Sequence, residues 1–187
     1  MRTASQPAND EQRTSWKGMP SAGAEAVMND PTDQRFMREA LALAGRAAAA
    51  GEVPVAALIV ERDEIVAQAY NRREMWQDPT AHAEMIAIRK AAARRGTWRL
   101  TGLTLYVTLE PCTMCIGAII HSRLLRIVFG AWDPKAGACG SLLNVPSTPR
   151  LNHFVQVTGG VGEKESQALL QSFFRTLRTE AGVDAQL

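Results

Sequence analysis

Three side chains that bind transition metals occur in two short motifs of this sequence. His82 is followed two residues later by Glu84, and Pro111 is followed by Cys112 and Cys115. One imidazole and two thiolates are ligands that Zn²⁺ prefers, and three protein ligands leave its fourth tetrahedral position open to water. The neighbouring carboxylate of Glu84 can carry protons. The two motifs therefore predict a catalytic site with one Zn²⁺ per chain.

The chemistry follows from the order of these residues along the chain. H-x-E with a later P-C-x-x-C is the known signature of zinc-dependent nucleobase deaminases. Zinc lowers the pKa of a bound water from 15.7 to about 7, and the resulting hydroxide attacks the carbon that bears the amine. We assign Glu84 as the catalytic residue, which takes a proton from the water and hands it to a ring nitrogen. Ammonia then leaves.

A closed structural zinc site is the alternative, with Cys139, His121 or His153 as the fourth ligand. Such a site would have no use for Glu84, so the catalytic interpretation is favoured. We expect His121 and His153 to be ordinary hydrogen-bonded histidines. Cys139 is expected to fill space, with an exposed reactive thiol as the alternative.

Both motifs are predicted at the start of a helix. Asp78-Pro79-Thr80 resembles a helix cap followed by proline, which places His82 and Glu84 in the first turn. Inside a helix, residues two apart point to different sides, so only the helix end lets these two converge. The proline before the first cysteine suits another first turn, and the two cysteines, three residues apart, then share one face. The partial positive charge of a helix N-terminus favours their thiolate forms.

The rest of the pattern alternates helices and strands. Helices are expected from 30 to 51, from 78 to 96, at 113–122 and at 163–179, and strands at 53–60, 65–70, 103–109, 125–129 and 153–157. A long loop with a short helix is expected over 130–152. This alternation predicts an α/β fold of three layers, α/β/α, in which helices cover both faces of a sheet of about five strands.

The 187 residues suit one domain. We expect a disordered N-terminal extension at 1–30, a zinc-dependent deaminase domain at 31–180 and a flexible tail at 181–187. No apolar run reaches the roughly 18–20 residues that cross a membrane, and the start lacks a secretory signal. Three cysteines in this setting predict metal chemistry in the cytoplasm rather than disulfides.

Charge does not identify the substrate. The formal net charge is only +2, which is too small to indicate a nucleic-acid binder. Basic residues do cluster on the second helix and after it, and we interpret them as solvated: Arg89, Lys90, Arg94, Arg95 and Arg99.

Beyond the zinc motifs, residues 33–178 resemble the bacterial-type tRNA-specific adenosine deaminases, the TadA family. The matching segments are 52–55, 71–72, 78–84, 105–112, 117–118, 121–123, 128–131, 152–153 and 173–175, with Asp133, Lys135 and Gly137. The resemblance implies a cytidine deaminase-like fold, a homodimer, and conversion of adenosine to inosine at the wobble position of a tRNA anticodon. Departures occur at Ala56, Trp132, Cys139 and Ser172.

The resemblance also implies a set of substrate contacts. It implies that Asn71 contacts the flipped nucleotide and that the anticodon loop lies near Asp133, Lys135, Phe174 and Arg175. Two alternatives stay open at this stage. One is a deaminase of a free base or nucleotide, such as cytosine or guanine, and the other is an RNA-binding subunit with a structural zinc.

Overall fold

Five strands form one mixed sheet in the order β2-β1-β3-β4-β5 in the computed structural model, which describes residues 30–184. The strands are β1 (Ala56–Glu61), β2 (Glu64–Tyr70), β3 (Thr104–Leu109), β4 (Arg126–Ala131) and β5 (Gln156–Gly159). β1 is antiparallel to both of its neighbours, whereas β3, β4 and β5 are parallel. The carboxyl ends of β3, β4 and β5 therefore lie along one edge of the sheet.

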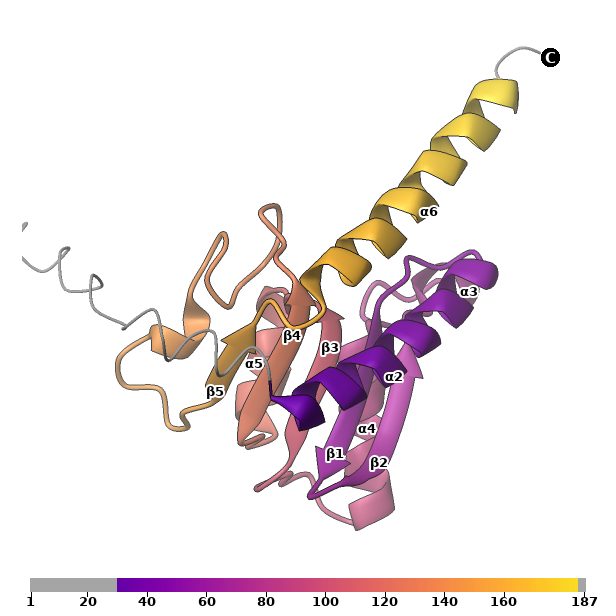
Figure 1. The fold of residues 1–187 in the computed structure, drawn as a ribbon. Coiled ribbons are helices and arrows are strands. Elements are labelled where there is room, and N and C mark those ends of the chain that lie inside the picture. Colours follow the sequence, from indigo (N-terminus) through magenta and orange to yellow (C-terminus); the bar gives the residue numbers. More distant parts are fainter. Residues whose placement is uncertain (1–29, 185–187) are drawn as a thin grey trace, which may run out of the picture.

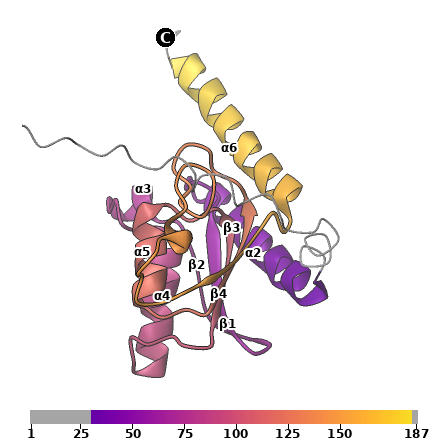
Figure 2. The ribbon, with the colours of Figure 1, turned by 90° about the vertical axis from the view of Figure 1, so that its left-hand side faces the viewer.

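Helices cover both faces of this sheet, which confirms the predicted three layers. Helices α2 (Pro31–Ala49) and α6 (Glu163–Asp184) lie on one face, and α4 (Ala83–Arg95) and α5 (Thr113–His121) lie on the other (Figures 1 and 2). A short helix, α3 (Arg73–Trp76), precedes α4, and a 3-10 turn, η2 (Val145–Ser147), lies in the long loop. The predicted N-terminal extension falls outside the described residues, except for Asp30. Helix α6 continues to Asp184, four residues past the predicted domain end at 180.

The central strands are buried on both faces, which explains their continuous apolar runs. In β1, Ile59 packs into the core beneath α4 and α5 with Phe129, while the adjacent Leu58 packs beneath α2 with Phe36. Neighbouring residues of a strand point to opposite faces, so each strand supplies both cores. The sheet is thus a rigid support between the two helical layers.

A buried polar network fixes α2 to its face of the sheet. The Asp33 carboxylate, fully buried, accepts hydrogen bonds from Arg126 at 2.8 and 2.6 Å and from the Tyr106 hydroxyl at 2.8 Å. Burial and the neighbouring Asp33 raise the pKa of Tyr106, so its hydroxyl stays protonated as a donor. This network lies on the α2 side, away from α4 and α5.

The predicted solvated basic cluster is exposed but also has a structural task. Lys90 and Arg94, one turn apart on α4, donate to the backbone carbonyls of Gln68 at 3.1 Å and Val66 at 2.9 Å. These carbonyls belong to β2, which lies at the edge of the sheet. Basic side chains over an edge strand block pairing with another chain.

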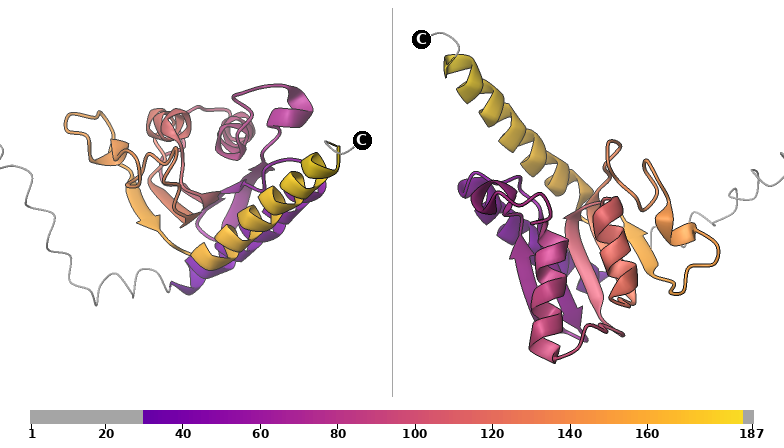
Figure 3. Two further views of the ribbon diagram at one scale, coloured as in Figure 1. Left: turned by 90° about the horizontal axis from the view of Figure 1, so that it is seen from above. Right: turned by 180° about the vertical axis from the view of Figure 1, so that it is seen from behind.

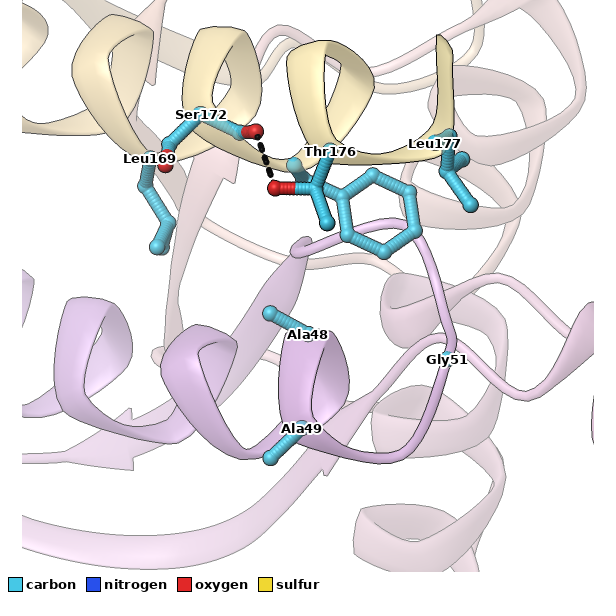
Figure 4. Close-up of a pocket in the computed structure, with 8 residues that line it drawn as sticks. Ala48, Ala49, Gly51, Leu169, Ser172, Thr176 and Leu177 are labelled. Carbon is cyan, nitrogen blue, oxygen red and sulfur yellow. Dashed lines mark hydrogen bonds between the residues drawn. The ribbon is translucent and has the colours of Figure 1, made fainter. Parts of the chain in front are cut away.

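The C-terminal end of α2 and the middle of α6 leave a groove of about 400 Å³ between them (Figure 4). Ala48, Ala49 and Gly51 form one wall, and Phe173 and Leu177 of α6 belong to the other. None of the described residues that line it is titratable. Within residues 30–184, no helix is both long enough and apolar enough to cross a membrane.

Some predicted element boundaries are wrong. The last strand is Gln156–Gly159 rather than 153–157, because His153 lies outside the ladder and its Nε2 is 2.6 Å from the Leu124 carbonyl.

Helix α3 was not predicted at all. Its amides at Glu74 and Met75 donate to the carboxylate of Glu52, at 3.3 and 2.8 Å, so a distant residue stabilises it.

Candidate metal centre and active site

Helices α4 and α5 lie side by side and begin at the same end of the molecule (Figure 3). His82 Nδ1 lies 3.7 Å from Cys112 Sγ and 3.6 Å from Cys115 Sγ. A tetrahedral zinc ion with bonds of about 2.0–2.3 Å separates nitrogen and sulfur ligands by about 3.6 Å. All three ligand atoms lie within 4.8 Å of one another, so the cluster is suited to one zinc ion.

The two ligand segments differ from the prediction in one respect. Helix α4 begins at Ala83, so His82 is its N-cap residue rather than a member of the first turn. The Asp78 carboxylate instead closes a local turn, accepting from the amide and hydroxyl of Thr80, both at 2.7 Å. Cys112 is likewise the N-cap residue of α5, with extended backbone, so Pro111 precedes this helix rather than lying in its first turn. Each helix thus presents a metal ligand at the end where its unpaired amides face outward.

The electrostatics of the cluster favour the thiolate of Cys112 and the protonated thiol of Cys115. The pKa of Cys112 is lowered to about 3, because its thiolate accepts hydrogen bonds from Cys115 and then from His82. The pKa values of its two partners are raised. The hydrogen bond with Cys112 raises the pKa of His82, and the hydrogen bond with Cys112 together with burial raises the pKa of Cys115. Protons therefore occupy the cluster when no metal is bound, and a metal displaces them.

Glu84 lies beside the cluster and is almost completely buried, at 3% exposed. Burial raises its pKa above the ordinary value. Its Oε2 has no hydrogen-bond partner within residues 30–184. Buried polar atoms are nearly always paired, so an unpaired carboxylate oxygen next to a metal cluster indicates a group kept free for a reaction.

Asn71 is placed next to the same helix end. Its Oδ1 accepts the amide of Ala83 at 2.9 Å, which is one of the unpaired donors at the start of α4. Within residues 30–184, its NH₂ group makes no hydrogen bond. Asn71 therefore holds α4 with one end of its amide and has the other end available for a ligand.

The three residues considered as a fourth ligand do not join the cluster. Of the described residues, the metal-binding group contains only His82, Cys112 and Cys115. Burial raises the pKa of the Cys139 thiol to about 12, and this side chain is 6% exposed, as expected for a space-filling residue. Three protein ligands are the arrangement of a catalytic site rather than a closed structural one.

The other predicted substrate contacts fall into two groups, one on the loop that pairs with Cys112 and one on α6. Asp133 and Lys135 belong to the loop after β4, where the Asp133 carboxylate accepts the Lys135 amide at 2.9 Å and so shapes a turn. Phe174 and Arg175 are exposed on α6, and Phe174 stacks edge-on against Phe173. Since α6 lies on the α2 side of the sheet, a single chain does not bring these two residues to the metal ligands.

Glu110 was not singled out from the sequence. It is 2% exposed, directly precedes Pro111 and Cys112, and binds the loop that follows β4. One signal in the sequence could have pointed to Glu110: it is a charged residue that follows an apolar strand and comes just before a metal ligand. Its partners lie more than twenty residues away along the chain, so no local pattern reveals them.

Comparisons with known proteins agree with this geometry. The family model "Cytidine and deoxycytidylate deaminase zinc-binding region" matches residues 30–131. The tRNA-specific adenosine deaminase of Bacillus subtilis (strain 168) is 50% identical over 146 residues, covering 78% of this chain and 91% of that protein. A solved structure from studies of A-to-I editing by tRNA:A34 deaminases at the wobble position of transfer RNA has a TM-score of 0.70 and 43% identity, covering 73% of this chain and 99% of that one. A guanine deaminase from Nitrosomonas europaea has a TM-score of 0.65 and 27% identity, covering 83% and 93%.

Proposed function

The chain belongs to the tRNA-specific adenosine deaminases, within the zinc-binding cytidine and deoxycytidylate deaminase family, and we propose that it converts adenosine to inosine at the wobble position of a tRNA anticodon. The observation that carries the reaction is the open three-ligand cluster beside the unpaired carboxylate of Glu84. The tRNA substrate is supported by 50% identity across nearly the whole length of a tRNA-specific relative.

His82, Cys112 and Cys115 would hold the zinc ion, which supplies a water activated as a nucleophile. The Glu84 carboxylate takes up the proton released by that water and donates it to a ring nitrogen of adenine. The water oxygen bonds to C6 of the base, Glu84 then moves the second proton of that oxygen to the amine, and the C6–amine bond breaks so that ammonia leaves and C6 keeps a carbonyl oxygen. The raised pKa of Glu84 suits a group that gains and loses a proton in turn.

Substrate binding is proposed for five residues. Asn71, whose NH₂ group is unpaired within the described chain, would hold the flipped nucleotide beside the cluster. Lys135 and Asp133 would face the anticodon loop, and Phe174 and Arg175 would contact it by stacking and charge. An anticodon loop suits this site because its bases are unpaired, so extruding one costs little.

A homodimer is part of the same proposal. Phe174 and Arg175 belong to α6, which lies on the α2 side of the sheet, whereas the cluster lies at the starts of α4 and α5, so a partner chain would supply contacts that one chain does not. Large apolar side chains exposed on and near the long loop support an interface: Phe154 is 75% exposed, Leu142 57% and Leu143 48%. We place the enzyme in the cytoplasm, where its proposed tRNA substrate is found.

The test is a series of synthetic anticodon stem-loops that carry one adenosine each. With adenosine at the wobble position we expect inosine, measured by nuclease digestion and mass spectrometry. Moving the adenosine one position along the loop should nearly abolish the product. Equal conversion at every loop position would contradict recognition of the wobble site.

A further inference from the structure

Glu110 uses both carboxylate oxygens to bind one loop. It accepts the backbone amides of Asp133 at 3.0 Å, Cys139 at 2.8 Å and Ser141 at 3.0 Å, and also the Ser141 hydroxyl. These donors all lie within residues 133–141, which we call the rim loop. Four donors converging on two oxygens need an acceptor that carries no hydrogen, which among side chains means an ionised carboxylate.

The rim loop is also joined directly to the metal-ligand segment. The Ala138 amide donates to the Pro111 carbonyl at 2.9 Å, and Gly137 forms an isolated β-bridge with Cys112. Gly137 has no space for a side chain, since a Cβ there would lie 2.3 Å from Glu110 Oε2 and 2.5 Å from the Asp133 carbonyl. The close approach of backbone and carboxylate thus fixes the loop against Cys112.

Other buried carboxylates bind different parts of the fold. Asp33 binds side chains of the sheet on the α2 side, and Glu52 binds two amides of α3. Glu110 differs because its partners belong to the loop that carries Asp133 and Lys135, next to a zinc ligand. A displacement of this loop would therefore change the contacts that are proposed for a bound substrate.

We propose that Glu110 is a positioning residue for deamination: its carboxylate holds the rim loop in the place where the loop meets the RNA beside Cys112. This inference rests on the proposed function. Within residues 30–184, the hydrogen bonds of the Glu110 side chain go to the rim loop and not to the side chains of the metal ligands. Loss of the carboxylate should therefore weaken substrate binding more than the chemical step.

The first test is Glu110→Gln in the zinc-loaded, full-length enzyme. The amide would turn NH₂ hydrogens toward amides that need an acceptor. Residues that orient a metal site's surroundings typically change activity about 10- to 100-fold. We expect the KM for the wobble-adenosine stem-loop to rise by about that factor, with kcat changed less than about threefold and zinc kept at one per chain.

Cys139 provides a second measurement that does not involve the substrate. This thiol lies in the rim loop and is buried, so iodoacetamide should modify it slowly in the wild-type enzyme. Site-resolved mass spectrometry should show faster modification in Glu110→Gln. Asp33→Asn is the matched control, because it also removes a buried carboxylate but on the α2 side, and it should leave Cys139 protected.

Gly137→Ala tests the same arrangement without changing Glu110, and it serves if Glu110→Gln does not fold. The added Cβ should displace the rim loop and give the same rise in KM and in Cys139 modification. Unchanged KM and a protected Cys139 in a folded variant would overturn the proposal, as would loss of zinc from Glu110→Gln. If the wild-type enzyme produced no inosine, the proposed function would fail, while the Cys139 measurement would still test the loop.

Discussion

Two buried glutamates near the metal cluster differ in how their oxygens are bonded. Glu110 satisfies both oxygens with four donors, whereas Glu84 has an oxygen with no partner within the described residues. An unpaired buried oxygen destabilises a fold. The satisfied carboxylate therefore suits a structural task, and the unsatisfied one suits proton transfer.

Replacing Glu84 by glutamine should abolish most of the turnover while preserving the metal. Gln has nearly the same shape but cannot take up the proton, and general acid–base catalysis contributes about 10²–10⁴-fold. Single-turnover inosine formation on a stem-loop should fall by at least that factor, with one zinc per chain by metal analysis. A near-normal rate would remove Glu84 from the mechanism.

The three cysteine variants should differ in zinc content. Cys112→Ala and Cys115→Ala each remove a ligand of the cluster and should lose zinc, whereas Cys139→Ala should keep it. The wild-type chain is the reference in the same elemental analysis. Full zinc retention in Cys112→Ala, or zinc loss in Cys139→Ala, would show that the ligands are assigned incorrectly.

At the scale of elements, the site consists of two helix starts brought together. The sequence predicted both helices and all three ligands, because the residue types and spacing are local signals. It placed the start of α4 too early, because Asp78-Pro79-Thr80 resembles a helix cap. In the structure Asp78 bonds to Thr80 to make a separate turn, which competes with helix formation.

Features that depend on distant residues were not predictable in the same way. The order of the sheet strands and the tasks of Glu110 and Glu52 come from contacts across more than twenty residues. The four residues of α3 are too few for a periodic pattern. The five strands and three layers were predicted, since β1, β3 and β4 are mostly apolar runs, whereas β5, with the sequence Gln-Val-Thr-Gly, was placed three residues too early at its start.

Asn71 holds the start of α4 and is also proposed to bind the substrate, and two variants distinguish these two roles. Asn71→Ala loses both the acceptor for the Ala83 amide and the NH₂ group, whereas Asn71→Asp keeps the acceptor. We expect Ala to lower the free energy of unfolding by about 0.5–2 kcal/mol, as for a lost helix cap, and Asp to recover it. Urea unfolding measures this.

Activity of the same pair tests the substrate contact. Both variants should keep zinc and lose inosine formation, because both lack the NH₂ group that is proposed to hold the nucleotide. Recovery of full activity in Asn71→Asp would show that Asn71 acts only by holding α4.

In the molecule as a whole, the sheet separates two layers of helices. Helices α4 and α5 carry the metal ligands on one face of the sheet, next to the rim loop, whereas α2 and α6 cover the opposite face (Figure 2). The sheet between them is buried on both faces, so the ligands of the metal rest on a rigid base. The RNA contacts proposed above belong to both layers, and for this reason we propose that two chains surround one anticodon loop.

A dimer mass is therefore expected in solution. One subunit is small for wrapping an anticodon loop, and the proposed contacts of α6 lie away from the cluster of the same chain. Light scattering of the zinc-loaded protein at micromolar concentration should give twice the mass of the 20.4 kDa chain. A monomer mass under these conditions would contradict the two-chain arrangement.

Competition in one reaction shows whether the enzyme deaminates adenosine within RNA or a free compound. The zinc-loaded enzyme receives a stem-loop with a wobble adenosine together with free adenosine, cytosine and guanine, and mass spectrometry follows every product. We expect inosine in the stem-loop, with the free compounds left essentially unchanged. Rapid deamination of free guanine or cytosine, with no inosine in the stem-loop, would contradict this expectation and identify a free-base deaminase instead.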